Sequence, residues 1–355
     1  MEFPNYQPDF NQRPSQRQKI FFAWFGASIL IIAGFVVYHW ASDEVLREIT
    51  IYNNQPTIWN KVANLLTFLP IQQDDPDYVM PIKEPSRLDV LVMGIRGKDD
   101  LADGGLLTDT ILLFSFDRTT GKASLVSIPR DLYVTISSGK KDKLNTAYER
   151  LGLGGAKKLF SKITGVYVDN AVVFNFTAFE KIIDTLGGVD ITLDKPFEEK
   201  QQWGYTFALP AGLNHLDGQN ALYYARSRYS TSDFDRAARQ QQLILAIKQK
   251  ILATDFISDP LKALSLINAI RSNIVTDFNI LDTTSLLDLA HQIDTSTLKR
   301  YVLTTDNFLY DTHAEDGAYI LLPRGGHLDQ IKKLFTGLPH TIATPVPTPS
   351  ESPKQ

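Results

Sequence analysis

The sequence predicts an α/β protein: a three-layer α-β-α domain with a largely buried mixed central sheet, preceded by one N-terminal transmembrane helix. Short apolar runs bounded by turn residues alternate with amphipathic runs of helical period, and one long uncharged segment lies near the N-terminus. Buried strands are typically short continuous apolar runs, whereas helices that cover a sheet place apolar residues three and four apart. The 43% apolar content is enough for a sizeable core.

The long uncharged segment runs from Ile20 to Trp40 and contains no Asp, Glu, Lys or Arg. As a helix it spans a hydrocarbon core of about 30 Å. It is longer than the apolar stretch of a cleaved signal peptide and does not end in a small-x-small cleavage site. Arg13, Arg17 and Lys19 precede it, so the positive-inside rule places residues 1–19 in the cytoplasm. We therefore expect a single-pass protein of the cell membrane whose domain is extracytoplasmic.

The rest of the chain divides by composition. Residues 41–84 have scattered helical pattern followed by Pro and Asp, which predicts an extracytoplasmic stalk. Residues 339–355 form a Pro/Ser/Thr tail with too few apolar groups to offset chain entropy, so we expect disorder there. Residues 85–338 are then the folded domain.

Five apolar runs within this domain predict strands. They are Leu88–Met93, Thr110–Phe116, Ala123–Ile128, Ala171–Phe176 and Val189–Leu193.

Three helices are predicted from their starts and periods. Thr177 to Glu180 reads as a capping box that opens a helix ending at Gly187. Asp217 is the expected N-cap of a second helix, which ends near Arg226. A third runs from Asp235 to Leu252, with Asp233 or Asp235 as its cap. The residues of this helix expected to face inward are Leu243, Ile244, Ile247 and Ile251.

Composition excludes several classes of function. A net charge of −4 and a pI near 5.9 argue against binding of nucleic acid by a general basic surface. The sequence has no cysteine, which excludes disulfides, thiolate metal sites and cysteine nucleophiles. The six histidines show no pair spacing, so no zinc site is expected. GxSxG, Walker A and GxGxxG motifs are absent, which leaves serine hydrolase and nucleotide-binding functions without support.

Charged residues gather at the ends of the predicted apolar elements, where loops at a sheet edge usually place chemistry. Taken singly, neighbours such as Arg130 and Asp131 are more often surface ion pairs. The four clusters are Gly94 to Gly97, Thr108-Asp109-Thr110, Pro129-Arg130-Asp131 with Lys143, and Arg226 to Arg228 with Asp233 to Gln241.

The last cluster has the spacing of an anion site. Arg236, Arg239 and Gln240 stand at i, i+3 and i+4 on the first turns of a helix, where free N–H groups and the positive dipole end attract anions. Arg226 and Arg228 add forked donors that suit phosphate oxygens. Together with the arginine of the third cluster, this is more positive charge than one carboxylate needs. A diphosphate is the better match.

In this order the motifs resemble the LytR-CpsA-Psr family of bacterial cell-envelope proteins, also known for a cell-envelope-related transcriptional attenuator domain. Eight motifs carry the resemblance, from about residue 86 to 254, with a continuation to Phe335. They are Gly94 after the first strand, Thr108 to Thr110, Val126 to Asp131, Lys143 to Tyr148, Phe179 to Asp190, Gly212 to Gly218, Ala221 to Arg228 and Asp233 to Gln241.

The resemblance implies a membrane-anchored phosphotransferase. Such an enzyme moves a glycopolymer with its proximal phosphate from a polyprenyl-diphosphate carrier to a hydroxyl of peptidoglycan or another cell-envelope acceptor. The implied partners are that lipid-linked glycopolymer, the acceptor and membrane lipid, without nucleic acid. The implied site is a long apolar pocket for the lipid, with arginines and Mg²⁺ at the diphosphate.

Residue roles follow by position. The resemblance implies that Arg130, Asp109 and Asp131 are catalytic, with Asp109 also at the metal. The acceptor hydroxyl needs a base, and the sequence does not decide between the two aspartates. The predicted diphosphate-binding residues are Arg226, Arg228, Arg236, Arg239, Gln240, Lys143 and Arg96.

One position departs from the family pattern. Family members often carry an acidic residue two positions after the glycine of the first strand, where this sequence has Arg96. Asp99, Asp100 and Asp103 are the alternatives for a second carboxylate near the metal, or Arg96 supplies part of the metal's charge. We expect Mg²⁺ to assist in either case.

Two alternative functions stay open. One is a polyprenyl-diphosphate-binding envelope regulator without catalysis, and the other is a pyrophosphate hydrolase that uses the same residues. A regulator acting on DNA is disfavoured, because residues 1–19 are too few for a DNA-binding fold. Transfer and hydrolysis differ only in how the acceptor is positioned, which the sequence does not reveal.

Overall fold

The computed structural model describes residues 79–97, 104–137, 139–253, 270–278, 291–293 and 297–339. The predicted cytoplasmic tail, transmembrane helix, most of the stalk and nearly all of the C-terminal tail lie outside these ranges, as does Asp103. Within the described ranges, no helix is long and apolar enough to cross a membrane.

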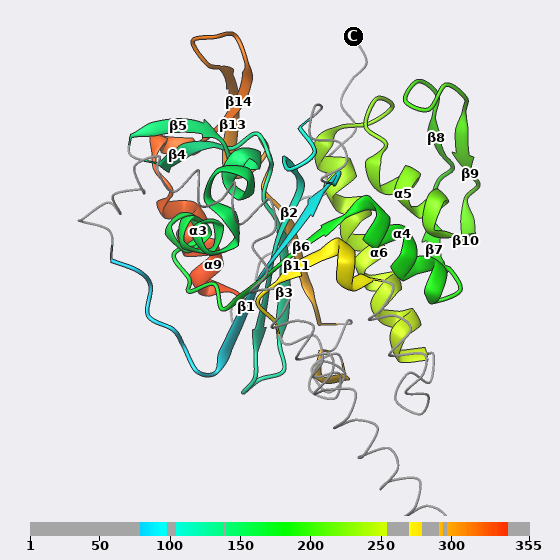
Figure 1. Ribbon diagram of the computed structural model, residues 1–355, viewed down its shortest axis with the longest axis horizontal. Coiled ribbons are helices and arrows are strands. Elements are labelled where there is room, and N and C mark those ends of the chain that lie inside the picture. The colour runs from blue at the N-terminus through cyan, green and yellow to red at the C-terminus, as the bar shows by residue number, and fades with distance from the viewer. Residues whose placement is uncertain are drawn as a thin grey trace, which may run out of the picture. The chain divides into compact units, whose positions relative to one another are not determined.

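A six-stranded mixed sheet forms the centre of the domain (Figure 1). Strand β1 pairs antiparallel with β2 and parallel with β6, and β3 pairs parallel with β12. The expected mixed sheet is therefore confirmed. In spatial order its strands are β11 (Ile274–Thr276), β6 (Asn170–Asn175), β1 (Arg87–Ile95), β2 (Thr108–Asp117), β3 (Ala123–Ser127) and β12 (Lys299–Val302).

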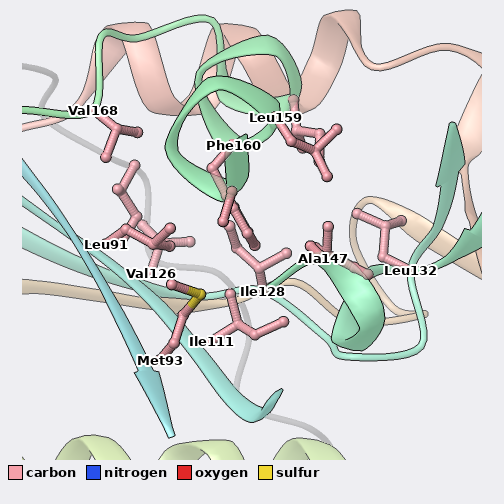
Figure 2. Close-up of a cluster of buried hydrophobic side chains, with 14 of the residues drawn as sticks. Leu91, Met93, Ile111, Val126, Ile128, Leu132, Ala147, Leu159, Phe160 and Val168 are labelled. Atoms are coloured by element: carbon pink, nitrogen blue, oxygen red, sulfur yellow. The ribbon is translucent and has the colours of Figure 1, made fainter. Parts of the chain in front are cut away.

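Helices cover both faces of this sheet, which makes three layers (Figure 1). On one side lie α3 (Ala147–Thr164) and α9 (Asp329–Gly337), and on the other lie α4 (Phe176–Thr185), α5 (Gly218–Arg226) and α6 (Asp233–Ala253). Figure 2 shows the core beneath α3, where Leu91 and Met93 of the sheet point toward Phe160. A second cluster packs α4, α5 and α6 through Ile183 and Leu243.

Four hairpin-like pairs of short strands surround the central sheet. The predicted strand Val189–Leu193 exists as β7, and its alternating burial fits a strand that is covered on one side. The pairs are β4 (Tyr133–Ser137) with β5 (Lys140–Lys143), β7 (Val189–Leu193) with β10 (Gly212–Leu216), β8 (Phe197–Glu199) with β9 (Phe207–Leu209), and β13 (Leu309–His313) with β14 (Tyr319–Pro323).

The start of α4 corrects the predicted capping box. The N-cap is Asn175, whose side-chain oxygen accepts the N–H of Ala178 at 2.8 Å, and Thr177 is exposed within the first turn. Asn caps a helix at least as well as Thr, so the earlier residue begins the helix directly after β6. The predicted Asp217 cap of α5 is confirmed by its 2.8 Å bond from the N–H of Asn220.

The substitution Asn175→Ala should therefore lower the free energy of unfolding by about 1 kcal/mol, because the first turn of α4 loses its cap. The bond from the Asn175 side chain to Asn273 is lost as well. Thr177→Ala is the matched control and should change stability by less than about 0.5 kcal/mol. Urea denaturation followed by circular dichroism measures both, and a larger loss for Thr177→Ala would contradict the assignment of the cap.

Candidate functional site

Two cavities lie side by side at one edge of the central sheet. The first has a volume of about 360 Å³ and the second about 350 Å³. Residues that line both cavities are Asp109, Thr110, Arg130, Arg236 and Gln240. These shared residues form the boundary between the two cavities.

The strand directions explain why distant clusters meet here. Because β1 and β2 are antiparallel, the end of β1 at Gly94 lies beside the start of β2 at Thr110. The ends of β3, β6 and β12 reach the same edge. Glycine suits position 94, because a Cβ there would lie 3.0 Å from the Cβ of Thr110. The first three sequence clusters are thus brought together by strand pairing.

Arg130 lies at the centre of three carboxylates. Its Nη1 donates to Oδ1 of Asp109 at 2.5 Å, and its Nε lies 3.5 Å from Asp131 and 3.4 Å from Asp233. Burial alone would lower the pKa of this guanidinium, but Asp109, Asp233 and Asp131 outweigh burial and raise the pKa. The Nε–H is nevertheless buried without a hydrogen bond to the described residues. It is a donor that a bound oxygen would satisfy.

Lys143 supports Asp131 and does not line either cavity. Its Nζ donates to Oδ1 of Asp131 at 2.8 Å from the end of β5. The pairing of β4 with β5 turns its ammonium group toward the carboxylate, and the predicted role of Lys143 at the diphosphate stays a prediction. Asp131 is held between this lysine and Arg130.

The start of α6 places Arg236 at the boundary and Asp233 beside it in the second cavity. Ser232 and Asp235 form a reciprocal capping box, with bonds of 3.1 Å from the N–H of Asp235 and 3.0 Å from the N–H of Ser232. The helix begins at Asp233, two residues before the predicted start, and the cap is Ser232 rather than either aspartate. The side chain of Asp233 is therefore available to Arg130 and Arg236.

Arg236 is a buried arginine on the boundary. Its Nη2 donates to the carbonyl of Asp109 and to Oδ2 of Asp233, both at 3.3 Å. Burial, reinforced by Arg130, lowers its pKa despite the attraction of Asp233. Gln240, one turn further, donates to the carbonyl of Ala225 at 3.2 Å. Both predicted residues thus line the cavities.

Arg226 and Arg228 lie on the wall of the first cavity beside aromatic rings. The guanidinium of Arg226 lies 4.2 Å from the ring centroid of Phe176 and 5.1 Å from that of Trp203, and Arg228 lies 5.5 Å from that of Tyr229. Such cation–π contacts fix the plane of a guanidinium while its charge stays effective.

Gln202 and Trp203 were not among the predicted site residues. The side chain of Gln202 donates to the carbonyl of Arg226 at 3.1 Å and accepts the N–H of Arg228 at 2.9 Å. It therefore fixes the backbone between the two arginines. The Gln-Trp pair lies between two short strands, and no sequence pattern links it to a helix that begins more than a dozen positions later.

Arg239 does not line either cavity. It is buried, with donated bonds of 3.0 Å to the carbonyl of Tyr224 and to the hydroxyl of Thr231, and a further bond to the carbonyl of Ser227. These bonds tie the end of α5 to α6. The role of Arg239 at the diphosphate stays a prediction, and in this structure its donors satisfy the orphan carbonyls of a helix end.

The lining of the first cavity also includes apolar side chains from four elements. Phe174 comes from β6, Phe179 from α4, Leu222 from α5 and Ile244 from α6. Ile244, predicted to face inward, is half-buried in this lining, whereas Leu243 is fully buried. The first cavity therefore joins five arginines to apolar side chains, an arrangement that suits an amphiphilic anion. The five are Arg96, Arg130, Arg226, Arg228 and Arg236.

Carboxylates are few in the first cavity. Asp109 is the carboxylate that lines it among the described residues, and Arg96 lines it near the end of β1. The described residues contain no group of three His, Asp or Glu placed to hold a metal ion. Asp109 can supply one ligand, and the alternatives for a second, Asp99, Asp100 and Asp103, lie outside the described residues.

The fold and the site together define an α/β domain with an arginine-walled anion cavity at one sheet edge. The LytR_cpsA_psr family profile matches residues 68–336, and the chain belongs to this family, LytR-CpsA-Psr. The predicted resemblance is therefore confirmed.

Named relatives match part of the chain. The regulatory protein MsrR of Staphylococcus aureus (strain Mu50 / ATCC 700699) is 34% identical over 48% of this chain and 51% of MsrR. TagU of Enterococcus faecalis (strain ATCC 700802 / V583), a polyisoprenyl-teichoic acid–peptidoglycan teichoic acid transferase, is 31% identical over 56% of this chain and 64% of TagU. The chain thus spans between about half and two thirds of the length of these relatives.

Solved structures share the fold. TagT bound to LI-WTA is 25% identical, with a TM-score of 0.57 over 72% of this chain and 93% of that chain. TagV of B. subtilis is 23% identical, with a TM-score of 0.58 over 71% of this chain and 97% of that chain. These structures confirm the mixed α/β architecture.

Proposed function

We propose that this protein is a phosphotransferase that moves a glycopolymer with its proximal phosphate from a polyprenyl-diphosphate carrier to a hydroxyl of peptidoglycan or another envelope acceptor. The observation that carries the proposal is the first cavity, whose lining combines five arginines with apolar side chains. Arginine forks suit diphosphate oxygens, and the apolar side chains suit the prenyl chain next to them. The teichoic acid transferase activity named for TagU supports the same class of reaction.

The reaction exchanges one P–O bond for another. The acceptor oxygen bonds to the phosphorus next to the polymer, the bond from this phosphorus to the bridging oxygen breaks, and polyprenyl phosphate leaves. The hydroxyl proton passes to a carboxylate beside Arg130: the candidates are Asp109 at the boundary and Asp131 and Asp233 in the second cavity. Phosphoryl transfer depends mainly on positioning of the reacting groups and on cations that stabilise the negative charge of the transferred phosphoryl group. Arg130 can orient the phosphate oxygens and supply one such cation.

The proposal includes a cellular location for the domain. Anchorage by residues 20–40 would hold the domain on the extracytoplasmic face of the membrane that carries the lipid-linked substrate. Nucleic acid is not among the proposed partners, since the net charge of the chain is −4.

The test is a transfer assay with the full chain in lipid vesicles. A short glycopolymer linked to polyprenyl diphosphate serves as donor and peptidoglycan fragments as acceptor, and mass spectrometry identifies the product. A phosphodiester between polymer and peptidoglycan supports transfer. Release of polymer phosphate without acceptor modification would indicate the hydrolase, and donor binding without turnover would indicate the regulator.

Mg²⁺ fits this site as a partner of the bound substrate. Asp109 provides one carboxylate, and Mg²⁺ is commonly held by one or two carboxylates together with substrate phosphates and retained waters. When bound, Mg²⁺ would neutralise part of the diphosphate charge. The chain's own contribution would be the arginines of the first cavity, among which Arg226, Arg228 and Arg236 would bind and orient the same oxygens.

Excess chelator should lower the transfer rate by about tenfold or more, and added Mg²⁺ should restore it. Calorimetry should detect little Mg²⁺ binding to the protein alone, and clear binding once geranylgeranyl diphosphate is present. Asp109→Asn should reduce this diphosphate-dependent binding, whereas Asp142→Asn, outside both cavities, should not. Equal transfer rates with Mg²⁺ and with chelator would overturn the proposal.

A further inference from the structure

We propose that the second cavity is the acceptor site and that it binds a neutral carbohydrate through the face that carries the attacked hydroxyl. This inference rests on the proposed function and names the place of the second substrate. The residues that carry it line the second cavity and not the first: Asp131, Asp233, Phe234, Ala237, Tyr319 and Leu321.

The two cavities differ in charge. The cations that belong to the first cavity alone are Arg96, Arg226 and Arg228, and its one carboxylate is shared. The second cavity has no cation of its own among the described residues but has the carboxylates of Asp131 and Asp233. A diphosphate is therefore attracted to the first cavity and repelled from the second, whereas neutral hydroxyl groups can donate to these carboxylates.

The relative position of the cavities fits an in-line reaction. In phosphoryl transfer the attacking and leaving oxygens lie on opposite sides of the phosphorus. The cavities meet at Arg130 and Arg236, so a diphosphate held in the first cavity presents its reacting phosphorus to the second. The buried Nε–H of Arg130 faces Asp131 and Asp233 at ion-pair distances but makes no hydrogen bond to the described residues, so an acceptor oxygen on this side would satisfy it.

Tyr319 supplies an aromatic wall that suits a sugar ring. It begins β14 of the hairpin formed with β13, which rises from the sheet edge in Figure 1. The N–H of Leu321 donates to the carbonyl of Asp131 at 2.9 Å, which fixes the hairpin beside the carboxylates. Burial and then Asp311, Asp131 and Asp233 raise the pKa of the Tyr319 hydroxyl, so it stays a neutral donor. Its ring combines apolar and hydrogen-bonding surface, as sugar rings do.

Tyr319→Ala should raise KM for peptidoglycan fragments by about tenfold, as expected for loss of one aromatic anchor. The dissociation constant for geranylgeranyl diphosphate should stay within about twofold of the wild type. Tyr310→Ala is the matched control: Tyr310 belongs to the same hairpin and is 41% exposed, against 42% for Tyr319, but lies outside both cavities. It should leave both quantities unchanged.

A second pair of variants tests the cavity without removing a contact. Ala237→Met adds volume to the wall of the second cavity on α6, and Ala238→Met places the same side chain at the adjacent exposed position. Only the first should raise KM for the acceptor. Water is smaller than the carbohydrate acceptor and still fits the narrowed cavity. The ratio of donor hydrolysis to polymer transfer should therefore increase in Ala237→Met.

The acceptor-site proposal and the proposed function would fail on different results. If Tyr319→Ala and Ala237→Met keep the wild-type KM for the acceptor, or weaken diphosphate binding more than acceptor use, the second cavity is not the acceptor site. The proposed function would survive that result. If the wild-type protein neither binds geranylgeranyl diphosphate nor transfers polymer, the proposed function itself fails, and the acceptor assignment fails with it.

Discussion

Replacement of Arg130 by alanine should lower the rate of polymer transfer by about 10²–10³-fold, while donor binding changes by only a few fold. Arg130 lines both cavities, and its guanidinium lies within 3.5 Å of three carboxylates at the boundary between them. It can therefore contact the oxygens of the phosphoryl group in flight. Donor binding should persist because Arg226, Arg228 and Arg236 remain.

Transfer kinetics and calorimetry with geranylgeranyl diphosphate measure these two quantities for Arg130→Ala. Arg130→Lys is the companion variant: it keeps one charge but loses the fork, so its rate should be intermediate. Folding is checked by thermal unfolding, and it should be maintained because Asp131 keeps Lys143 and Asp233 keeps Arg236. An unchanged turnover in Arg130→Ala would remove this residue from the mechanism.

Much of the fold was predictable because the strands are strongly apolar. The runs at Leu88, Thr110, Ala123 and Ala171 all lie in strands of the central sheet, because buried strands must be apolar on both faces. Once these strands pair, the charged residues at their ends meet at one edge. The convergence of Asp109 and Arg130 follows from this topology.

Other features of the fold and the site depend on tertiary contacts that the periodicity of the sequence does not reveal. Arg236 and Arg239 share one side of α6 in sequence, yet only Arg236 reaches the cavities, because carbonyls at the end of α5 bind Arg239. The N-cap of α4 is Asn175 rather than the predicted Thr177, because two good capping residues lie near the start of this helix. Tyr319 lies almost two hundred positions after Arg130, and the contact of Leu321 with Asp131 and Leu132 places its hairpin at the site.

The double variant Arg226→Gln with Arg228→Gln should weaken binding of geranylgeranyl diphosphate by about 10²–10⁴-fold. Charge-assisted bonds contribute about 1.5–3 kcal/mol each, and two arginines of the first cavity are removed. The variant also loses the contacts of the Arg226 guanidinium with the rings of Phe176 and Trp203, so its folding is checked by thermal unfolding. Calorimetry at constant ionic strength measures the affinity, because salt screens part of this attraction.

Arg239→Lys is the control that separates charge from position. It keeps the positive charge near α5 but breaks the three bonds of the guanidinium to Tyr224, Ser227 and Thr231. The free energy of unfolding should fall by about 1–3 kcal/mol, while diphosphate affinity stays within about twofold. If Arg239→Lys instead weakened binding as much as the double variant, the affinity would depend on how α5 and α6 are joined, and Arg226 and Arg228 would not be the direct ligands of the diphosphate.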